Sequence, residues 1–153
     1  MSDITATIEW NRNSDDFLDN RYSRVHHWTF DGGTTVIASS SPHIVRVPMS
    51  DPSAVDPEEA FIASLSSCHM LWFLSIAAQK GWRINHYKDK AVGQMGKNSA
   101  GKTVMLSVFL RPCIAWDSSA PTTAEISEMH EAAHQECFIA NSVLTDVQIE
   151  PQE

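Results

Sequence analysis

Apolar and polar residues alternate along the first part of the chain in the pattern that β-strands produce. Residues 4–10, 25–30 and 34–38 are rich in β-branched and aromatic side chains, and two consecutive glycines separate the last two segments. Such a glycine pair favours a hairpin turn. Residues 39–55 contain three prolines and several serines, so we interpret them as a connecting loop. The pattern predicts a small sheet followed by this loop.

A long helix is predicted to begin at the end of the loop. Asp56 occupies the N-cap position, Pro57 the first helical position, and Glu58 and Glu59 the first turn, where acids are favourable. A glutamate at the third helical position can also return a hydrogen bond to the cap. Apolar residues then recur at helical spacing until Gly81, which is typical of a helix end.

The serines of residues 64–67 leave two versions of this helix open. Serine is unfavourable inside a helix and favourable at an N-cap, so the helix can stop there and restart, with Cys68 in its new first turn. A continuous helix would instead separate Glu58 and Cys68 by about 15 Å along its axis. The two side chains could not then share a site.

The centre of this helical region, Met70–Ala78, is apolar nearly all round, which is typical of a helix covered on every side. A monomer of 153 residues has little material to cover it, so we expect a homodimer. The remaining elements expected are two long strands at 84–95 and 102–116, a helix opening at 121–125 and a last strand at 143–149. The length of the chain predicts a single domain over residues 1–153.

The charge balance narrows the classes of partner. With 19 acidic against 11 basic residues, the net charge is −8, and no basic run appears, so no nucleic-acid partner is expected. Polar residues interrupt residues 60–78, which therefore fall short of a membrane span, and no membrane partner is expected. The N-terminal segment lacks the pattern of a secretory signal, and three cysteines are an odd count for a disulfide framework. We expect a cytoplasmic protein.

Cys68 and Cys137 are the residues with the most suggestive chemistry. In the first turn of a helix, free backbone N–H groups and the helix dipole would stabilise the thiolate of Cys68. Cys137 lies where the second helix is predicted to end. Their separation along the chain excludes a CxxC motif, so only the fold can bring them together. The simpler interpretation is packing, because cysteine is often buried, and packing is the default role for Cys113.

A metal site is an alternative use of the same thiols. His130, His134 and Cys137 lie at i, i+4 and i+7, on one face of the second helix, and Cys68 could complete a tetrahedral zinc site. Two arguments oppose a zinc site. The sequence lacks the paired-ligand repeat of common zinc modules, and a histidine in a helix is more often a surface residue or a hydrogen-bonded core residue. A hydrolase that uses His69 or His134 as the base for a cysteine is a lesser alternative.

Two segments carry a resemblance to a known family. Residues 56–74, with an Asp-Pro-Glu-Glu start and a Ser-Ser-Cys-His core, and residues 134–143, with His-Gln-Glu-Cys, resemble the OsmC/Ohr family of thiol-dependent peroxidases. The upstream segments 22–26 and 30–33 resemble one branch of that family. The similarity therefore extends over nearly the whole chain, with both cysteine motifs in the family's order and spacing.

The resemblance implies an OsmC-like α+β fold, with antiparallel sheets around two central helices in an intertwined homodimer. It implies that Cys68 is the peroxidatic thiol and Cys137 the resolving thiol, in sites at the dimer interface. Glu58 would hold a catalytic arginine by a charge-assisted pair. Arg24 fits the Tyr-Ser-Arg-x-His pattern and is our choice, while Arg21, which has the opposite strand parity, is the alternative.

The same resemblance implies a reaction. The Cys68 thiolate would reduce an organic hydroperoxide to an alcohol and become a sulfenic acid, which Cys137 would convert to a disulfide. An external dithiol, such as that of a lipoyl-bearing protein, would restore both thiols. No metal, flavin or nucleotide cofactor is required.

Several features near the thiols leave alternatives open. Met70, Trp72 and Phe73 provide apolar surroundings that favour an organic hydroperoxide over hydrogen peroxide, or are simply core residues. A non-catalytic protein that binds an apolar ligand would use the same surroundings. The histidines His26, His27 and His69 could tune the pocket in a way that differs between branches of the family.

Overall fold

The computed structural model of the chain describes residues 3–13 and 15–152, so Met1 and Ser2 of the segment inspected for a secretory signal lie outside the described residues. The chain forms two compact units, Met1–Ala60 and Phe61–Glu153. Within the described residues there are two α-helices and eight strands, which confirms the predicted α+β class. Each unit is considered by itself below.

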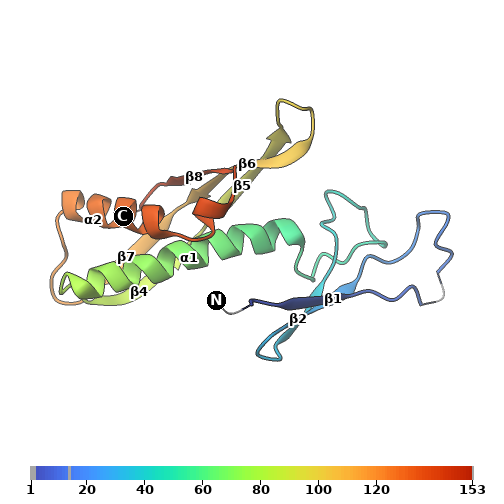
Figure 1. Ribbon diagram of the computed structural model, residues 1–153, viewed down its shortest axis with the longest axis horizontal. Coiled ribbons are helices and arrows are strands. Elements are labelled where there is room, and N and C mark those ends of the chain that lie inside the picture. The colour runs from blue at the N-terminus through green and yellow to red at the C-terminus, as the bar shows by residue number, and fades with distance from the viewer. Residues whose placement is uncertain (1–2, 14, 153) are drawn as a thin grey trace. The chain divides into compact units, whose positions relative to one another are not determined.

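The first unit contains a three-stranded antiparallel sheet (Figure 1). Its strands are β1 (Ala6–Glu9), β2 (His26–Phe30) and β3 (Thr35–Ala38), in the order β1-β2-β3. Gly33 closes the predicted hairpin with φ of 86°, a backbone conformation that glycine adopts without strain. The loop after β3 returns to it, because the Ser39 N–H donates to the Val55 carbonyl at 2.9 Å. The three predicted strands are confirmed.

The helix α1 (Pro57–Gln79) begins and ends where the sequence predicts. The Glu59 N–H donates to Asp56 Oδ1 at 2.8 Å, and the Asp56 N–H donates to Glu59 Oε2 at 3.2 Å, which together form the expected capping box. At the other end Gly81 has φ of 83°. The Trp82 N–H there donates back to the Ala77 carbonyl at 2.9 Å, as in a glycine-terminated helix.

Of the two versions of α1 that the serines left open, the structure has the continuous one, because the helix runs without interruption through them. Ser64 Oγ donates to the Phe61 carbonyl at 2.7 Å, and Ser66 Oγ donates to Asp89 Oδ2 at 2.5 Å. Both hydroxyls donate to these acceptors while their residues remain helical, so neither serine caps a second helix. Cys68 lies in the helix interior, where helical hydrogen bonds use the backbone N–H groups, so it is not activated by a helix N-terminus.

The second unit contains most of α1, two sheets and two further helical segments. Its elements are β4 (Ile84–Asp89), β5 (Val92–Lys97), β6 (Thr103–Leu110), β7 (Pro112–Trp116), α2 (Thr123–Glu136), the 3₁₀-helix η1 (Ala140–Ser142) and β8 (Asp146–Ile149). Strand β4 pairs with β7, and β6 lies between β5 and β8. All pairs are antiparallel except β6 with β8, which is parallel and departs from the predicted antiparallel pattern.

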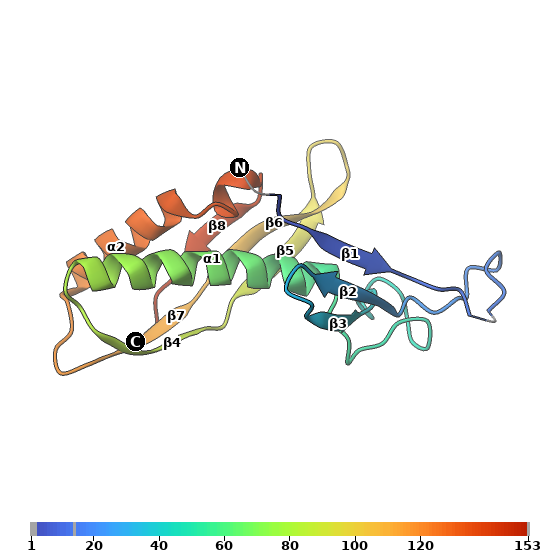
Figure 2. The ribbon, with the colours of Figure 1, turned by 60° about the horizontal axis from the view of Figure 1, so that its bottom comes forward.

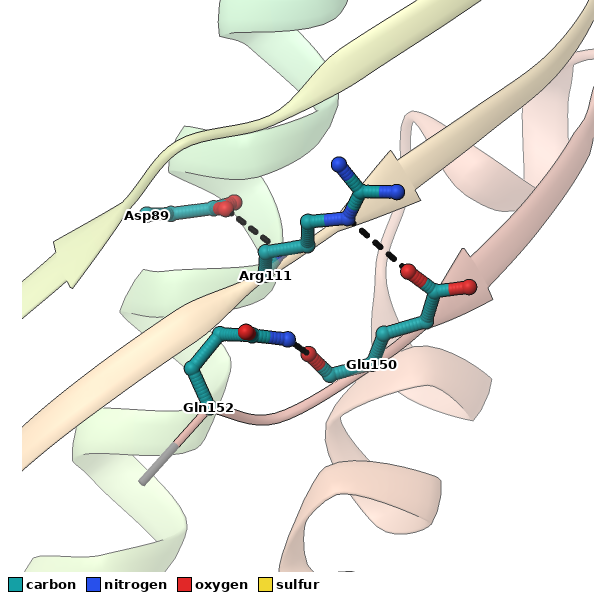
Figure 3. A network of polar contacts seen from close by, with 4 residues as sticks. All are labelled: Asp89, Arg111, Glu150 and Gln152. Carbon is teal, nitrogen blue, oxygen red and sulfur yellow. Dashed lines mark hydrogen bonds and ion pairs between the residues drawn. The ribbon is translucent and has the colours of Figure 1, made fainter.

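The two long strands expected in this unit are each divided into two shorter strands that belong to different sheets. Figure 3 shows the polar network at the division. Asp89 Oδ1 accepts the Arg111 N–H at 2.6 Å, while Asp89 Oδ2 accepts the Ser66 hydroxyl. Arg111 Nε donates to Glu150 Oε2 at 2.9 Å, and Gln152 Nε2 donates to the Glu150 carbonyl at 2.7 Å. The Asp89 side chain therefore binds a backbone N–H between β6 and β7 and links it to α1. The Arg111 side chain extends the network to Glu150, directly after β8.

The core of the second unit lies between the helices and the sheets, with α2 alongside α1 in both views (Figures 1 and 2). One buried cluster joins the two helices, and it consists of Phe73, Ala77, Met129 and Ala133. A second cluster joins the start of α1 to β6, and it consists of Leu65, Val108 and Leu110. The first cluster places the second half of α1 against α2, and the second cluster places its first half against β6.

Much of α1 remains exposed. Only 22% of its apolar 18-residue stretch is buried, and Leu71 is 60% exposed. Contrary to our expectation from its polar interruptions, α1 is long and apolar enough, by length and composition, to cross a membrane. The core helices of soluble proteins pass the same test, so this property carries little weight. As expected from the sequence, a single chain covers α1 only in part.

Candidate functional site

The structure brings the two predicted thiols together. Cys68 lies on α1, and Cys137 is the C-cap residue of α2, as predicted. The Cys68 thiol lies close enough to Cys137 to raise the pKa of Cys137. Neither residue is in a disulfide. Because α2 packs along α1, two cysteines that are far apart in the sequence become neighbours.

The two thiols differ in their surroundings. Cys137 is 1% exposed, whereas Cys68 is half-buried. Burial is the main cause that raises the pKa of Cys137, and the neighbouring Cys68 raises it further, against the opposing effect of the Ala140 N–H. That N–H donates to Cys137 Sγ at 3.5 Å. Cys137 is therefore held as a neutral thiol, while Cys68 is the more accessible member of the pair.

Aromatic side chains surround the helices at this level. Trp72, one turn after Cys68, makes an edge contact with Phe138, with ring centroids 5.6 Å apart. Phe138 directly follows Cys137 and is 68% exposed. Phe73, by contrast, is fully buried in the cluster that joins the helices. Phe73 is therefore a core residue, whereas Trp72 contacts the aromatic residue that follows Cys137.

Two buried histidines lie between the helices beside the thiols. His69 Nε2 is 3.0 Å from His130 Nδ1, and the His130 ring stacks on Phe73 at 4.1 Å between centroids. Burial, followed by the charge of His134, lowers the pKa of His69 to about 4. Burial, followed by the charge of His69, lowers the pKa of His130 to about 3. Both imidazoles are therefore neutral at physiological pH.

The alternative uses of these histidines find little support in the geometry. Across residues 3–13 and 15–152 there is no group of three or more His, Cys, Asp or Glu side chains that could hold a metal ion. The four side chains proposed as zinc ligands therefore do not form a metal centre. His69 pairs with His130, which also leaves it poorly placed to serve as the base of a cysteine hydrolase.

The first unit contains a cavity of about 540 Å³. Its lining residues are Ile8, Trp10, Phe17, Tyr22, Arg24, His26, Ser39, Ser40, Pro57 and Glu58. Arg24 and Glu58, both predicted site residues, therefore face the same space. Arg21 is exposed and is not among the lining residues, so of the two candidate arginines only Arg24 shares this cavity with Glu58.

Arg24 and Glu58 are not paired with each other in this arrangement. The Arg24 guanidinium donates to the Asn20 carbonyl at 3.0 Å, to Asn20 Oδ1 at 2.9 Å and to the Tyr22 carbonyl. It also lies over the Tyr22 ring, 3.7 Å from the centroid. Glu58 Oε2 is buried and has no hydrogen-bond partner. A buried carboxylate oxygen without a donor is costly, so Glu58 is suited to receive a cation or another donor.

Sequence reasoning missed the aromatic wall of this cavity. Trp10, Phe17 and Tyr22 contact one another, with centroid distances of 5.8, 5.4 and 4.6 Å. The Trp10 indole N–H donates to the Ser23 carbonyl at 2.8 Å, which fixes its ring. These residues have no common period in the sequence, and only the return of the chain after β1 brings them together. They give the cavity an apolar aromatic wall, and the Arg24 guanidinium lies over one of its rings.

The fold and the site together describe an α+β protein with two neighbouring free thiols, one on each of two packed helices. The sequence model of the OsmC-like protein family matches residues 50–152, and the chain belongs to this family. Its structure superimposes on that of an OsmC-like protein of unknown function from Vibrio cholerae, which is 52% identical, with a TM-score of 0.97 over 99% of this chain and 100% of that one.

More distant structures share the fold. An organic hydroperoxide resistance protein from Elizabethkingia anophelis is 18% identical, with a TM-score of 0.72 over 99% of this chain and 94% of that one. The organic hydroperoxide resistance protein OhrB of Bacillus subtilis is 16% identical, with a TM-score of 0.68 over 99% and 98% of the two chains. No curated protein matches the sequence. The predicted family and fold are thus confirmed.

Proposed function

We propose that this protein is a thiol-dependent peroxidase that reduces organic hydroperoxides to alcohols. The observation that carries the proposal is the pair of adjacent free thiols with unequal exposure. A half-buried thiol can meet a peroxide, and a buried neutral thiol beside it can resolve the oxidised product before further oxidation. The names of the Elizabethkingia and Bacillus proteins agree with this chemistry.

In the proposed cycle, the Cys68 thiolate attacks the terminal oxygen of the hydroperoxide. The O–O bond breaks, the alkoxide takes up a proton and leaves as an alcohol, and Cys68 becomes a sulfenic acid. Cys137 then attacks the sulfenic sulfur, its proton leaves with the hydroxyl as water, and a disulfide forms. An external dithiol, which we expect on a lipoyl-bearing or similar protein of the cytoplasm, reduces that disulfide by exchange.

We assign the activation of Cys68 to Arg24, oriented by Glu58. Cys68 lies in the interior of α1, so the charge that stabilises its thiolate must come from a side chain. Arg24 faces a cavity with an apolar aromatic side, which suits the organic group of a peroxide, and Glu58 offers an unpaired oxygen there. A guanidinium shared between a carboxylate and a thiolate is held by charge-assisted hydrogen bonds.

We further propose that a second copy of the chain completes the site. A continuous α1 separates Glu58 from Cys68 by about 15 Å along the helix axis, so one helix does not bring its own two residues together. The exposed side of α1 carries small and apolar residues, namely Ala63, Ser64, Ser67, Leu71, Ser75 and Ala78. Such a surface suits burial against another protein chain. In the homodimer, Arg24 and Glu58 of one protomer would serve Cys68 of its partner.

The central experiment is intact-mass measurement after one equivalent of cumene hydroperoxide is added to the reduced protein. We expect a loss of two hydrogens that a reductant reverses. Cys68→Ser and Cys137→Ser should both abolish this loss, and Cys113→Ser, an exposed control, should retain it. Wild-type protein with confirmed reduced thiols that consumes no peroxide would refute the proposed function.

Subunit exchange tests the shared site. Cys68→Ser and Arg24→Ala chains, each inactive alone, are mixed under conditions that allow exchange. A heterodimer then has one site with the intact Cys68 of one chain and the intact Arg24 of the other, so activity should return to about a quarter of the wild-type value for random mixing. Absence of any rescue, with exchange verified by mass, would show that each chain completes its own site.

A further inference from the structure

His26 has a single possible tautomer when neutral, because of the residue two positions along β2. The Trp28 indole Nε1 donates to His26 Nε2 at 2.9 Å. An indole N–H can only donate, so His26 Nε2 must act as the acceptor and carry no hydrogen. In a neutral imidazole the remaining hydrogen is then on Nδ1. The proton position follows from the hydrogen-bond partners, as such assignments do.

The hydrogen on His26 Nδ1 points at the proposed catalytic arginine. His26 Nδ1 is 2.7 Å from the Arg24 carbonyl oxygen, so the imidazole donates and the backbone accepts. On the other side of the same residue, the Arg24 N–H donates to the Met49 carbonyl at 2.8 Å. Both peptide groups that flank the Arg24 Cα are therefore fixed, although Arg24 lies outside the regular hydrogen-bond ladder of the sheet.

The sheet gives this arrangement a rigid base. His26 and Trp28 lie two apart on β2, so their side chains share one face of the strand. His26 pairs with Ala38, a fully buried residue of β3, and Trp28 pairs with Ile8 of β1 and Val36 of β3. His27, between them, points to the other face and is exposed. The chain thus contains a neighbouring histidine that lacks the contact with Arg24.

We propose that His26, held by Trp28 in its Nδ1–H tautomer, is a positioning residue that fixes the backbone of Arg24 and so the direction of its guanidinium. This inference rests on the proposed function, since it assigns a purpose to the position of Arg24. His26 lines the same cavity as Arg24 and Glu58, so a shift in this backbone moves the guanidinium within that cavity. A misplacement of about 1 Å in a catalytic group can cost about a hundredfold in rate.

The first test compares three variants in a peroxide assay with cumene hydroperoxide and a dithiol reductant. His26→Leu keeps the size of the side chain and removes the donor, so kcat/KM should fall between about tenfold and a hundredfold. His26→Asn can place an amide N–H near the position of Nδ1 and should recover most of that loss. His27→Leu should stay within about twofold of wild type. A His26→Leu value equal to wild type, or no recovery in His26→Asn, would overturn the inference.

The second test does not depend on activity. Nitrogen NMR of histidine-labelled protein should show the His26 proton on Nδ1, and Trp28→Phe should release this preference. The Arg24 Nε–H resonance should shift in His26→Leu and stay unchanged in His27→Leu. If the wild type fails to turn over peroxide, the proposed function falls alone, and these spectra still decide the positioning role. A wild-type proton on Nε2 would overturn it.

Discussion

The thiol pair and the arginine cavity are two different kinds of surroundings in one small chain. The thiols lie on two packed helices whose shared core is apolar, with neutral histidines and a raised pKa at Cys137. The cavity lies at a sheet edge and loop, where charged groups make many hydrogen bonds and one carboxylate oxygen has none. The thiols thus lie in an apolar helix core, whereas Arg24 lies in the polar, hydrogen-bonded wall of a cavity.

This contrast predicts that substitutions in the helix core lower the stability of the protein more than substitutions at exposed residues do. Phe73 is fully buried between α1 and α2, so Phe73→Ala should lower the free energy of unfolding by about 3–5 kcal/mol. Phe138→Ala, at an aromatic residue that is 68% exposed, serves as the control and should change it by less than about 1 kcal/mol. Urea unfolding at fixed protein concentration measures both. Equal losses would contradict the described core.

Damage to the cavity should instead affect activity. Arg24→Ala should lower kcat for an organic hydroperoxide by about 10²–10³-fold, the range for loss of one donor to a developing charge, with little change in stability. Arg21→Ala should leave kcat near wild type, because Arg21 is exposed and lies outside the cavity lining. Steady-state kinetics and thermal unfolding of both variants test this. A larger effect at Arg21 would exchange the two assignments.

Acid should weaken the helix pair. His69 and His130 have folded-state pKa values of about 4 and about 3, below the ordinary value of 6.5, so the unfolded chain binds more protons between these limits. Stability is therefore full above pH 6.5 and falls as the pH drops toward 4, on the order of 2 kcal/mol per histidine by pH 5. Urea unfolding between pH 7.5 and 5 measures the slope.

The exposed His43 provides the control for this pH dependence. His43→Asn should keep the wild-type slope, whereas His130→Asn should flatten it, because one neutral buried imidazole has been removed. A wild-type protein whose stability is constant across this pH range would show that the histidines titrate normally in the folded state.

The smallest expected effect is at the start of α1. Asp56→Ala removes the N-cap acceptor of the Glu59 N–H and should cost about 1 kcal/mol, while Asp56→Asn retains an acceptor and should cost less. Thermal unfolding of the two variants compares them. Identical losses would mean that the negative charge, and not the capping hydrogen bond, is what stabilises this end of the helix.

Local features of the sequence correctly predicted where the helices begin and end. The cap at Asp56, the stop at Gly81 and the helix end at Cys137 each depend on groups within a few residues, and the structure has all three. The same logic could not decide between the two versions of α1 at Ser64–Ser67. Their hydroxyls are bonded in part by Asp89, which is far along the chain, and its position is known only after folding.

The sequence by itself determined the family, the α+β class, the helix boundaries and the identity of the two thiols. Tertiary structure alone decided that Asp89 divides the long strands, that His69 pairs with His130, and that Trp10, Phe17 and Tyr22 line one cavity with Arg24. The reason is range. Capping and periodicity act over one or two turns of chain, whereas a buried polar group takes whichever partner the packed fold brings within about 3 Å.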